Sequence, residues 1–262
     1  MGLQTITYEV GIDRVATVTL NRPEKLNAFN RVMLDEFADV WGRVRADDDV
    51  HAVVIRAAGE RAFSVGLDVA DPAARAATTA TVPFNQRDPG MSLGPRANRV
   101  WKPVVCAVHG MAAGGAFYWI NESDIVICSD DAQFFDPHVT YGMTSALEPI
   151  GLRWRIPLGE ALRWALMGLD ERMTAERALQ IGLVSEVVPR AALWERAHEI
   201  AALIAAKPTV ATQGTVRAIW ESLDQGRTQA LDASLRFVQI GNAIGETQVD
   251  RSSVPRPTPK LR

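Results

Sequence analysis

The sequence predicts an α/β protein with a helical C-terminal region, and three observations lead to this prediction. A strand, a turn, a helix and a further strand follow one another twice by residue 128, which is typical of α/β folds. From residue 159 onward, apolar residues recur at helical spacings instead. No change in composition divides the 262 residues into two folding units, so we expect one domain with a helical appendage.

Short runs of β-branched and other apolar residues mark the strands. We expect strands at residues 5–10, 15–20, 50–57, 103–108 and 124–128. Helices are expected where apolar residues recur every three or four positions, at 30–46, 116–121, 159–167, 175–181, 190–206, 208–223 and 228–244. Thr174 suits the N-cap position of the helix at 175–181, because its hydroxyl can accept a bond from a free amide of the first turn.

Two segments lack any sustained period. Residues 71–98 are rich in Ala, Thr, Pro and Gly, which predicts a long loop with at most one short helix. Residues 248–262 contain three prolines and few large apolar residues, which predicts a disordered tail.

Composition and charge exclude several functional classes. The net charge is -3, so the sequence gives no basic footprint for nucleic acid, and we expect no nucleic-acid partner. No stretch approaches the ~18 apolar residues of a membrane span, and MGLQTITYEV lacks the basic and apolar segments of a signal peptide. We therefore expect a cytoplasmic protein without a membrane partner.

Cys106 and Cys128 each lie in an apolar run and are expected to be small buried hydrophobes.

Two loops place small residues where a strand meets a helix. In Phe63-Ser64-Val65-Gly66-Leu67-Asp68, the glycine allows a sharp turn that points the next amide outward. In the second loop, residues 110–116, small residues open a helix whose unpaired amides favour negative charge. Two such amides aimed at one oxygen would form an oxyanion hole, although each loop alone is more often structural. Neither loop has the Gly-x-Gly-x-x-Gly pattern, so no nicotinamide cofactor is expected.

Four motifs in order resemble the enoyl-CoA hydratase/isomerase (crotonase) family. They are Asn21 to Ala28, Ala62 to Asp68, Lys102 to Gly115, and Ala175 to Pro189, within a similarity that spans roughly residues 5–245. The resemblance implies a crotonase-like spiral of repeated ββα units over residues 1–190. It also implies a helical region at 191–247 that forms a homotrimer, often as a dimer of trimers.

The resemblance also assigns residues to an acyl-CoA site. It implies that the amides of Leu67 and Gly115 hold the thioester oxygen, each preceded by a flexible glycine, Gly66 and Gly114, in a substrate-binding loop. Asp68 would shape the first loop, and the segment 71–98 would cover the acyl chain. The positions implied to line the coenzyme A pocket are Lys25, Leu26 and Ser64. No separate cofactor is expected, because coenzyme A enters as part of the substrate.

The sequence departs from the family where hydratases carry two glutamates that hold and activate water. Those positions hold Tyr118 and His138. His138 is a candidate acid/base, because an imidazole titrates near neutral pH. Tyr118 is a candidate for orienting a carbonyl or donating a proton, against the simpler interpretation of a core aromatic. Glu148 is a candidate replacement base, against a surface or capping carboxylate.

Other titratable residues are weaker candidates. Asp136 and Tyr141 lie near His138 in the sequence, whereas His51, His109 and His198 have no such placement and are expected to be structural. No group of residues has metal-ligand spacing, so no metal site is expected.

Three functions compete at this point. The first is an acyl-CoA lyase or isomerase with a rearranged acid/base set, which we expect to hydrate a simple short-chain enoyl-CoA poorly. The second is an acyl-CoA-binding protein with little or no catalysis. The third, a serine peptidase using Ser64, lacks a histidine partner near that serine. The sequence leaves open the identity of the acyl group and the choice among hydration, dehydration, isomerisation and hydrolysis.

Overall fold

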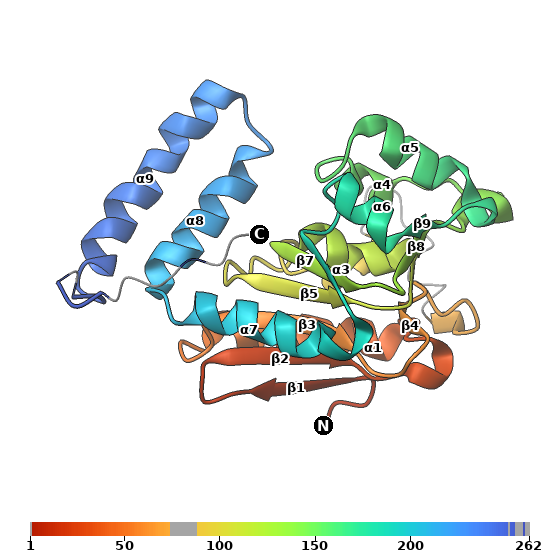
Figure 1. Ribbon diagram of the computed structural model, residues 1–262, viewed down its shortest axis with the longest axis horizontal. Helices are drawn as coiled ribbons and strands as arrows, with labels where there is room; N and C mark the ends of the chain where they lie inside the picture. Colours follow the sequence, from red (N-terminus) through yellow and green to blue (C-terminus); the bar gives the residue numbers. More distant parts are fainter. Residues whose placement is uncertain (1, 74–87, 251, 255–258, 260–262) are drawn as a thin grey trace.

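The computed structural model describes residues 2–73, 88–250, 252–254 and 259 (Figure 1). A six-stranded sheet has the order β1-β2-β3-β5-β7-β10, in which only the pair β1–β2 is antiparallel. Its strands are β1 (Ile6–Val10), β2 (Val15–Leu20), β3 (Ala52–Ala57), β5 (Val104–Val108), β7 (Ile125–Ser129) and β10 (Glu186–Val188). Each predicted strand is present, with ends that differ by at most two residues.

A smaller sheet has the order β4-β6-β8-β9. Its strands are β4 (Ala62–Ser64), β6 (Met111–Ala113), β8 (Gln133–Phe135) and β9 (Met173–Thr174). Each of β3, β5 and β7 in the large sheet is followed at once by β4, β6 or β8 in the small one, and the first three small strands pair in parallel. This repetition confirms the predicted spiral of ββα units. The sequence analysis missed the short strands, because two or three residues are too few to show a period.

Helices cover both faces of the large sheet. They are α1 (Arg31–Ala46), α3 (Phe117–Glu122), α4 (Leu147–Leu152), α5 (Leu158–Leu166), α6 (Ala175–Gln180), α7 (Leu193–Ala205), α8 (Thr209–Ser222) and α9 (Arg227–Gly245). The Thr174 hydroxyl accepts a bond from the amide of Arg177 at 3.2 Å, which confirms the predicted N-cap. The predicted helix at 116–121 is α3, and a 3-10 turn, Gly114–Ala116, leads into it. Helix α4 was not predicted.

The buried strands supply two cores because successive side chains point to opposite faces. Val53 and Ile55 of β3 join the larger core with α1 and α3, whereas Ala52 and Val54 join the smaller core under α7. In Figure 1, α7 lies across that face of the sheet. Cys106 and Cys128 are both free and buried in the larger core, as predicted. Burial raises the pKa of each thiol to about 12.

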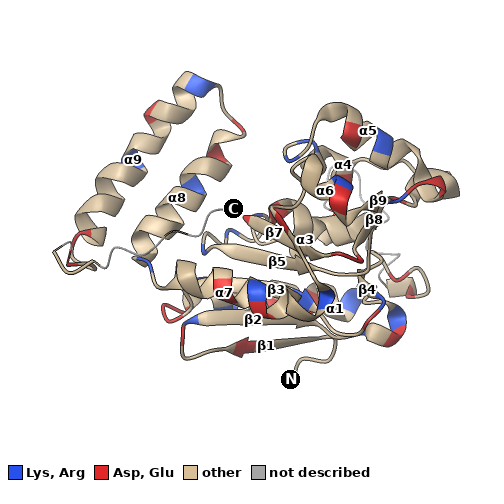
Figure 2. Ribbon diagram, viewed as in Figure 1, with Lys and Arg blue, Asp and Glu red and all other residues tan. Residues whose placement is uncertain are grey.

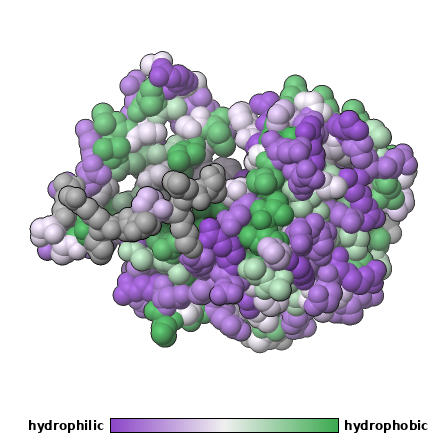
Figure 3. Space-filling model, viewed as in Figure 1, coloured by the Kyte–Doolittle hydropathy of each residue, from purple (hydrophilic) through white to green (hydrophobic). Residues whose placement is uncertain are grey.

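Helices α8 and α9 form an arm that projects from the body (Figure 1). No residue of α8 is buried, and α9 buries only Ala230, Gly241 and Gly245. The arm exposes large apolar side chains, including Ile219, Leu231, Leu235 and Ile240, and Figure 3 shows apolar patches on it. The role of residues 191–247 in trimer formation stays a prediction, and so does the boundary at residue 190. Helix α7, which follows that boundary, packs on the large sheet.

The remaining predictions concern the loop, the tail and the surface. Residues 74–87 of the predicted loop 71–98, and most of the predicted tail, lie outside the described residues. The described end of the loop contains the 3-10 turn Pro89–Ser92. Figure 2 shows acidic and basic residues interspersed over α5, α7 and the arm. Among the described residues, no helix is both long enough and apolar enough to cross a membrane.

Candidate active site

The loop after β4 presents the main-chain amide of Leu67. Leu67 forms an isolated parallel bridge with Phe29. In this bridge the amide of Phe29 donates to the Gly66 carbonyl at 2.8 Å, and the amide of Asp68 donates to the Phe29 carbonyl at 2.8 Å. The amide between them points to the other side of the chain, and no acceptor for it is present among the described residues. Leu67 therefore offers an amide without an acceptor among the described residues, and its role as an oxyanion donor stays a prediction.

Ser64 and Asn27 stabilise this loop through hydrogen bonds to its backbone and to neighbouring backbone. The Ser64 hydroxyl donates to the carbonyl of Asn27 at 2.8 Å and accepts from the amide of Gly66 at 3.2 Å. The Asn27 side chain donates to the carbonyls of Ala58 at 2.9 Å and Ala62 at 3.0 Å. Ser64 is fully buried, so its hydroxyl acts on the loop itself. The predicted role of Ser64 in substrate binding stays a prediction.

The segment that precedes the first loop has an uncommon backbone. Leu26 and Asn27 both adopt left-handed conformations, with φ of 52° and 53°. Such values are uncommon outside glycine and often occur at binding sites. Arg22 joins this segment to the loop through an ion pair with Asp68 at 3.0 Å, in which both side chains are largely buried. This ion pair ties Asp68 to the segment before the loop, and the substrate-binding role of Asp68 stays a prediction. Lys25, next to Leu26, is exposed to solvent.

The second loop lies directly against the first. A methyl group added to Gly66, which has φ of +85°, would lie 2.9 Å from the amide nitrogen of Gly115 and 3.1 Å from the carbonyl oxygen of Ala113. A side chain at residue 66 would clash at these distances. The backbones at Gly66 and Gly115 can therefore pack this closely only because residue 66 is a glycine. Gly115 lies in the 3-10 turn Gly114–Ala116, which leads into α3. The structure therefore brings the backbones of the two loops together at Gly66 and Gly115.

The phenyl ring of Phe29 fills the space beside Gly115. A methyl group on Gly115 would lie 2.5 Å from Cε1 of Phe29. The same ring meets Tyr118 and Trp119 edge to face, with centroids 6.4 and 6.1 Å apart. Because Phe29 also bridges to Leu67, one residue fixes both loops relative to each other.

His138 lies beside the second loop and is held by a buried carboxylate. A methyl group on Gly114, which has φ of +49°, would lie 3.4 Å from Cε1 of the His138 ring. The imidazole Nδ1 is hydrogen-bonded to Asp136, which is completely buried and also accepts a hydrogen bond from the Ser145 hydroxyl. Bonding to Asp136 raises the pKa of His138 above its ordinary value, although burial of the ring opposes the rise. This pair can therefore take up and release a proton.

Glu148 and Tyr118 complete the cluster. Glu148 is 7% exposed in the first turn of α4, and burial raises its pKa, which the nearby imidazole of His138 partly offsets. The Tyr118 hydroxyl donates a hydrogen bond to Asp88. Burial raises the pKa of Tyr118 far above its ordinary value, and Glu148 raises it further by its charge. The three candidate residues His138, Glu148 and Tyr118 therefore lie within electrostatic reach of one another.

The remaining candidates lie elsewhere. Tyr141 is 67% exposed and contributes nothing to the cluster. His51 bonds to the Ala205 carbonyl at 2.9 Å, and His198 pairs with Asp13 at 2.7 Å. His109 is fully buried, and burial lowers its pKa to about 4. No group of metal-ligating side chains occurs within the part of the chain that the structure describes.

Two residues of the cluster were missed by the sequence analysis. Asp88 reaches Tyr118 from a loop 30 residues earlier, and Ser145 reaches Asp136 from nine residues later. Neither residue lies in a periodic segment, and neither belongs to a motif. Only the three-dimensional structure could bring them to attention.

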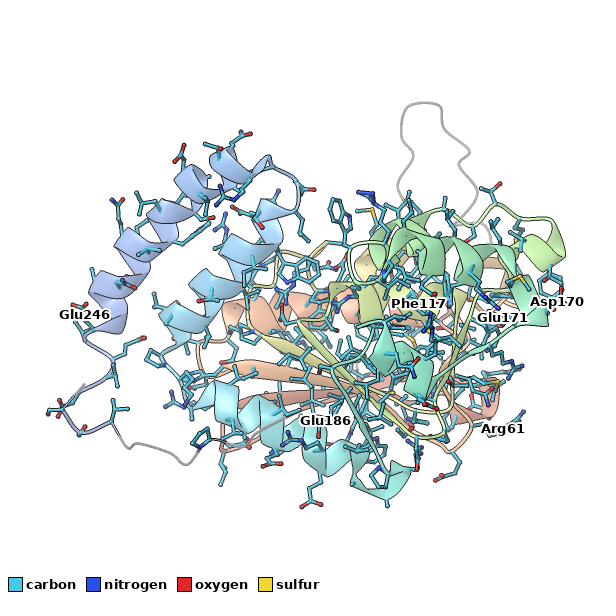
Figure 4. The ribbon with its side chains drawn as sticks, turned by 45° about the horizontal axis from the view of Figure 1, so that its top comes forward. Arg61, Phe117, Asp170, Glu171, Glu186 and Glu246 are labelled. Carbon is cyan, nitrogen blue, oxygen red and sulfur yellow. The ribbon has the colours of Figure 1, made fainter. Side chains whose placement is uncertain are left out.

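A separate hollow of about 380 Å³ lies at the edge of the molecule, bounded in part by Phe134, Trp164 and Glu171. In Figure 4, Glu171 lies at the outer edge, and Phe117 lies inside the body. Phe117, the first residue of α3, packs against Trp164 with ring centroids 4.3 Å apart and ring planes tilted by 55°.

Comparisons with known proteins identify the family of the chain. Residues 12–242 match the family model described as enoyl-CoA hydratase/isomerase. The chain is 34% identical to (E)-benzylidenesuccinyl-CoA hydratase of Thauera aromatica, in a match that covers 81% of each chain. It is 31% identical to 1,2-epoxyphenylacetyl-CoA isomerase of Escherichia coli, over 84% of this chain and 82% of the relative. A solved enoyl-CoA hydratase/isomerase from Mycobacterium paratuberculosis aligns with a TM-score of 0.83 at 36% identity, over 91% of this chain and 90% of the other.

Proposed function

This chain belongs to the enoyl-CoA hydratase/isomerase family, and we propose that it moves a proton on an acyl-CoA thioester whose enolate is held by two main-chain amides. The amides of Leu67 and Gly115 donate to the thioester oxygen, where negative charge develops when the α-carbon loses a proton. The close approach of Gly66 to Gly115 supports this assignment. Lys25, exposed beside Leu26, is available to a phosphate of the coenzyme A moiety.

His138 carries the proton in this proposal. The observation that supports its role most strongly is its bond to the buried carboxylate of Asp136, next to the Gly114 loop. A buried charge is costly unless it is paired, so Asp136 holds the imidazole firmly in one orientation and tautomer. The same bond makes the ring a stronger base. Such an arrangement suits proton transfer.

We further propose isomerisation rather than hydration as the main reaction. His138 takes a proton from the α-carbon of a β,γ-unsaturated thioester, which leaves a dienolate with its charge on the thioester oxygen. A proton is then returned to the γ-carbon, and Glu148 is the nearby acid, because burial raises its pKa and favours its neutral form. The proton held by His138 then passes to Glu148, which returns both groups to their starting forms. The double bond moves and no water is consumed. The glutamate pair that holds water in hydratases is replaced here by Tyr118 and His138.

The family and the exposed arm together support a homotrimer. Helices α8 and α9 expose a row of large apolar side chains, which a monomer would leave in water. In Figure 4, Glu246 at the end of α9 lies on the side of the molecule opposite Asp170. The arm therefore reaches outward, where a second copy of the chain can cover it. We propose the trimer as the unit that performs the reaction.

Incubation of the protein with 3-hexenoyl-CoA in deuterated water tests this function. We expect conversion to the 2-enoyl thioester with deuterium entering the chain, followed by NMR, while crotonyl-CoA is hydrated far more slowly. Hydration of crotonyl-CoA at ordinary enzyme rates, ~10 to 1,000 per second, would contradict the isomerase assignment. Tight binding of 3-hexenoyl-CoA with neither isomerisation nor exchange would favour the acyl-CoA-binding alternative.

A further inference from the structure

Tyr118 and Asp88 form a polar wall, which presents hydrogen-bond acceptors. Tyr118 lies three residues, about one helical turn, beyond Gly115. Its hydroxyl donates its only proton to Asp88, so the phenol oxygen keeps acceptor capacity alone. The carboxylate of Asp88 has further lone pairs, and the Glu148 carboxyl lies within electrostatic reach of both residues. Three oxygen-bearing side chains thus gather at one place.

The proton of Tyr118 is not available to a ligand. Burial and the neighbouring carboxylates raise the pKa of Tyr118, which keeps the phenol neutral and its proton shared with Asp88. A hydrocarbon acyl chain laid against this wall would remove water from the acceptors without replacing its hydrogen bonds. Leaving such a group without a hydrogen-bond partner once water is removed costs about 1 to 3 kcal/mol. A purely apolar acyl group is therefore a poor match for the wall.

We propose that the acyl group of the substrate carries a hydrogen-bond donor, a hydroxyl or a phenol, that binds to Tyr118 and Asp88. This inference rests on the proposed function, because it assumes that the thioester oxygen lies at Leu67 and Gly115. The donor then lies along α3, away from the thioester. Tyr118 is a specificity residue in this arrangement, and His138 with Glu148 moves the proton. Sites built to bond a hydroxyl reject analogues that lack it more strongly than apolar pockets reject an added group.

Binding of saturated thioesters tests this specificity without any reaction. Isothermal titration calorimetry compares hexanoyl-CoA with 6-hydroxyhexanoyl-CoA, and 3-phenylpropanoyl-CoA with its 4-hydroxyphenyl counterpart. We expect the hydroxylated member to bind about 10-fold tighter in at least one pair, which is the effect of one good hydrogen bond. Equal or weaker binding of the hydroxylated member in both pairs would overturn the proposal.

Two variants and a control test whether the preference for hydroxylated thioesters depends on Tyr118 and Asp88. Tyr118→Phe removes the acceptor oxygen, and Asp88→Ala removes its partner, so each should bring the preference in that pair to within about 2-fold of unity. Tyr8→Phe makes the same chemical change in β1 and should leave the preference intact, because Tyr8 is remote from the cluster. A preference that survives both Tyr118→Phe and Asp88→Ala would contradict the assignment to these residues. If no thioester binds the wild-type protein, the proposed function itself fails.

Discussion

Replacing His138 with alanine is expected to slow deuterium exchange and isomerisation of 3-hexenoyl-CoA by about 10²- to 10⁴-fold, the usual effect of losing a general base. His138 is the basic side chain that the structure places beside the Gly114 loop, and its bond to Asp136 orients the ring. Binding of the thioester should change little, because the amides and Lys25 remain. The measurement is kcat for isomerisation together with the dissociation constant of hexanoyl-CoA.

His198→Ala is a matched control for this variant. His198 also pairs with an aspartate, Asp13, but that pair lies on the surface away from the site. We expect its exchange rate to remain near that of the wild type. A His138→Ala protein that retains its rate within about 3-fold would remove His138 from the mechanism.

The pH dependence follows from the raised pKa of His138. The imidazole acts as a base only when neutral, and Glu148 acts as an acid only when protonated, so kcat/KM should be bell-shaped in pH. One limb belongs to His138, with a pKa above the ordinary histidine value. Because the bond to Asp136 is the main cause of the rise, the Asp136→Asn variant should titrate at lower pH. This shift separates a positioning role of Asp136 from a merely structural one, which would leave the profile in place.

Replacing Gly66 with alanine is the second large effect that we expect. Gly66 has φ of +85°, and its new methyl group would meet the amide nitrogen of Gly115 at 2.9 Å. The backbone must move to relieve this contact, which displaces the adjacent amide of Leu67. Loss of one oxyanion donor typically lowers kcat by about 10²- to 10³-fold, or about 3 to 4 kcal/mol of barrier.

Gly159→Ala is the matched control for that substitution. A methyl group on Gly159, in the first turn of α5, would meet no atom within 4 Å. We therefore expect full activity in Gly159→Ala. If Gly66→Ala folds normally and also keeps its kcat, the amide of Leu67 does not take part in catalysis. Circular dichroism of both variants checks the fold.

The sequence predicted the large sheet well because its strands are buried. Runs such as Val104–Val108 are apolar on both faces, and this pattern marks a buried strand clearly. The small sheet was missed because strands such as Gln133–Phe135 are short and owe their conformation to neighbours distant in sequence. Helix α4 was missed for the same reason, since Leu147–Leu152 contains a glycine and a proline and only six residues.

The candidate site was predicted in parts rather than as a whole. The two glycine-rich loops could be identified from the sequence, but the contact between Gly66 and Gly115 depends on the packing of β4 beside β6. Resemblance to the family directed attention to Tyr118 and His138. Asp136, two residues before His138, was named only as a weaker candidate, because the sequence does not show that its side chain turns back to the ring. Asp88 pairs with Tyr118 across a non-periodic loop, and such a pairing has no signature in the sequence.

A crystal structure of the protein with bound hexanoyl-CoA tests the central assignment most directly. If the account is right, the thioester oxygen lies within about 3.2 Å of both the Leu67 and Gly115 nitrogens, with the α-carbon facing the His138 ring. A carbonyl that bonds to neither amide, or only to water, would contradict it and leave the proposed enolate without its stabilising donors.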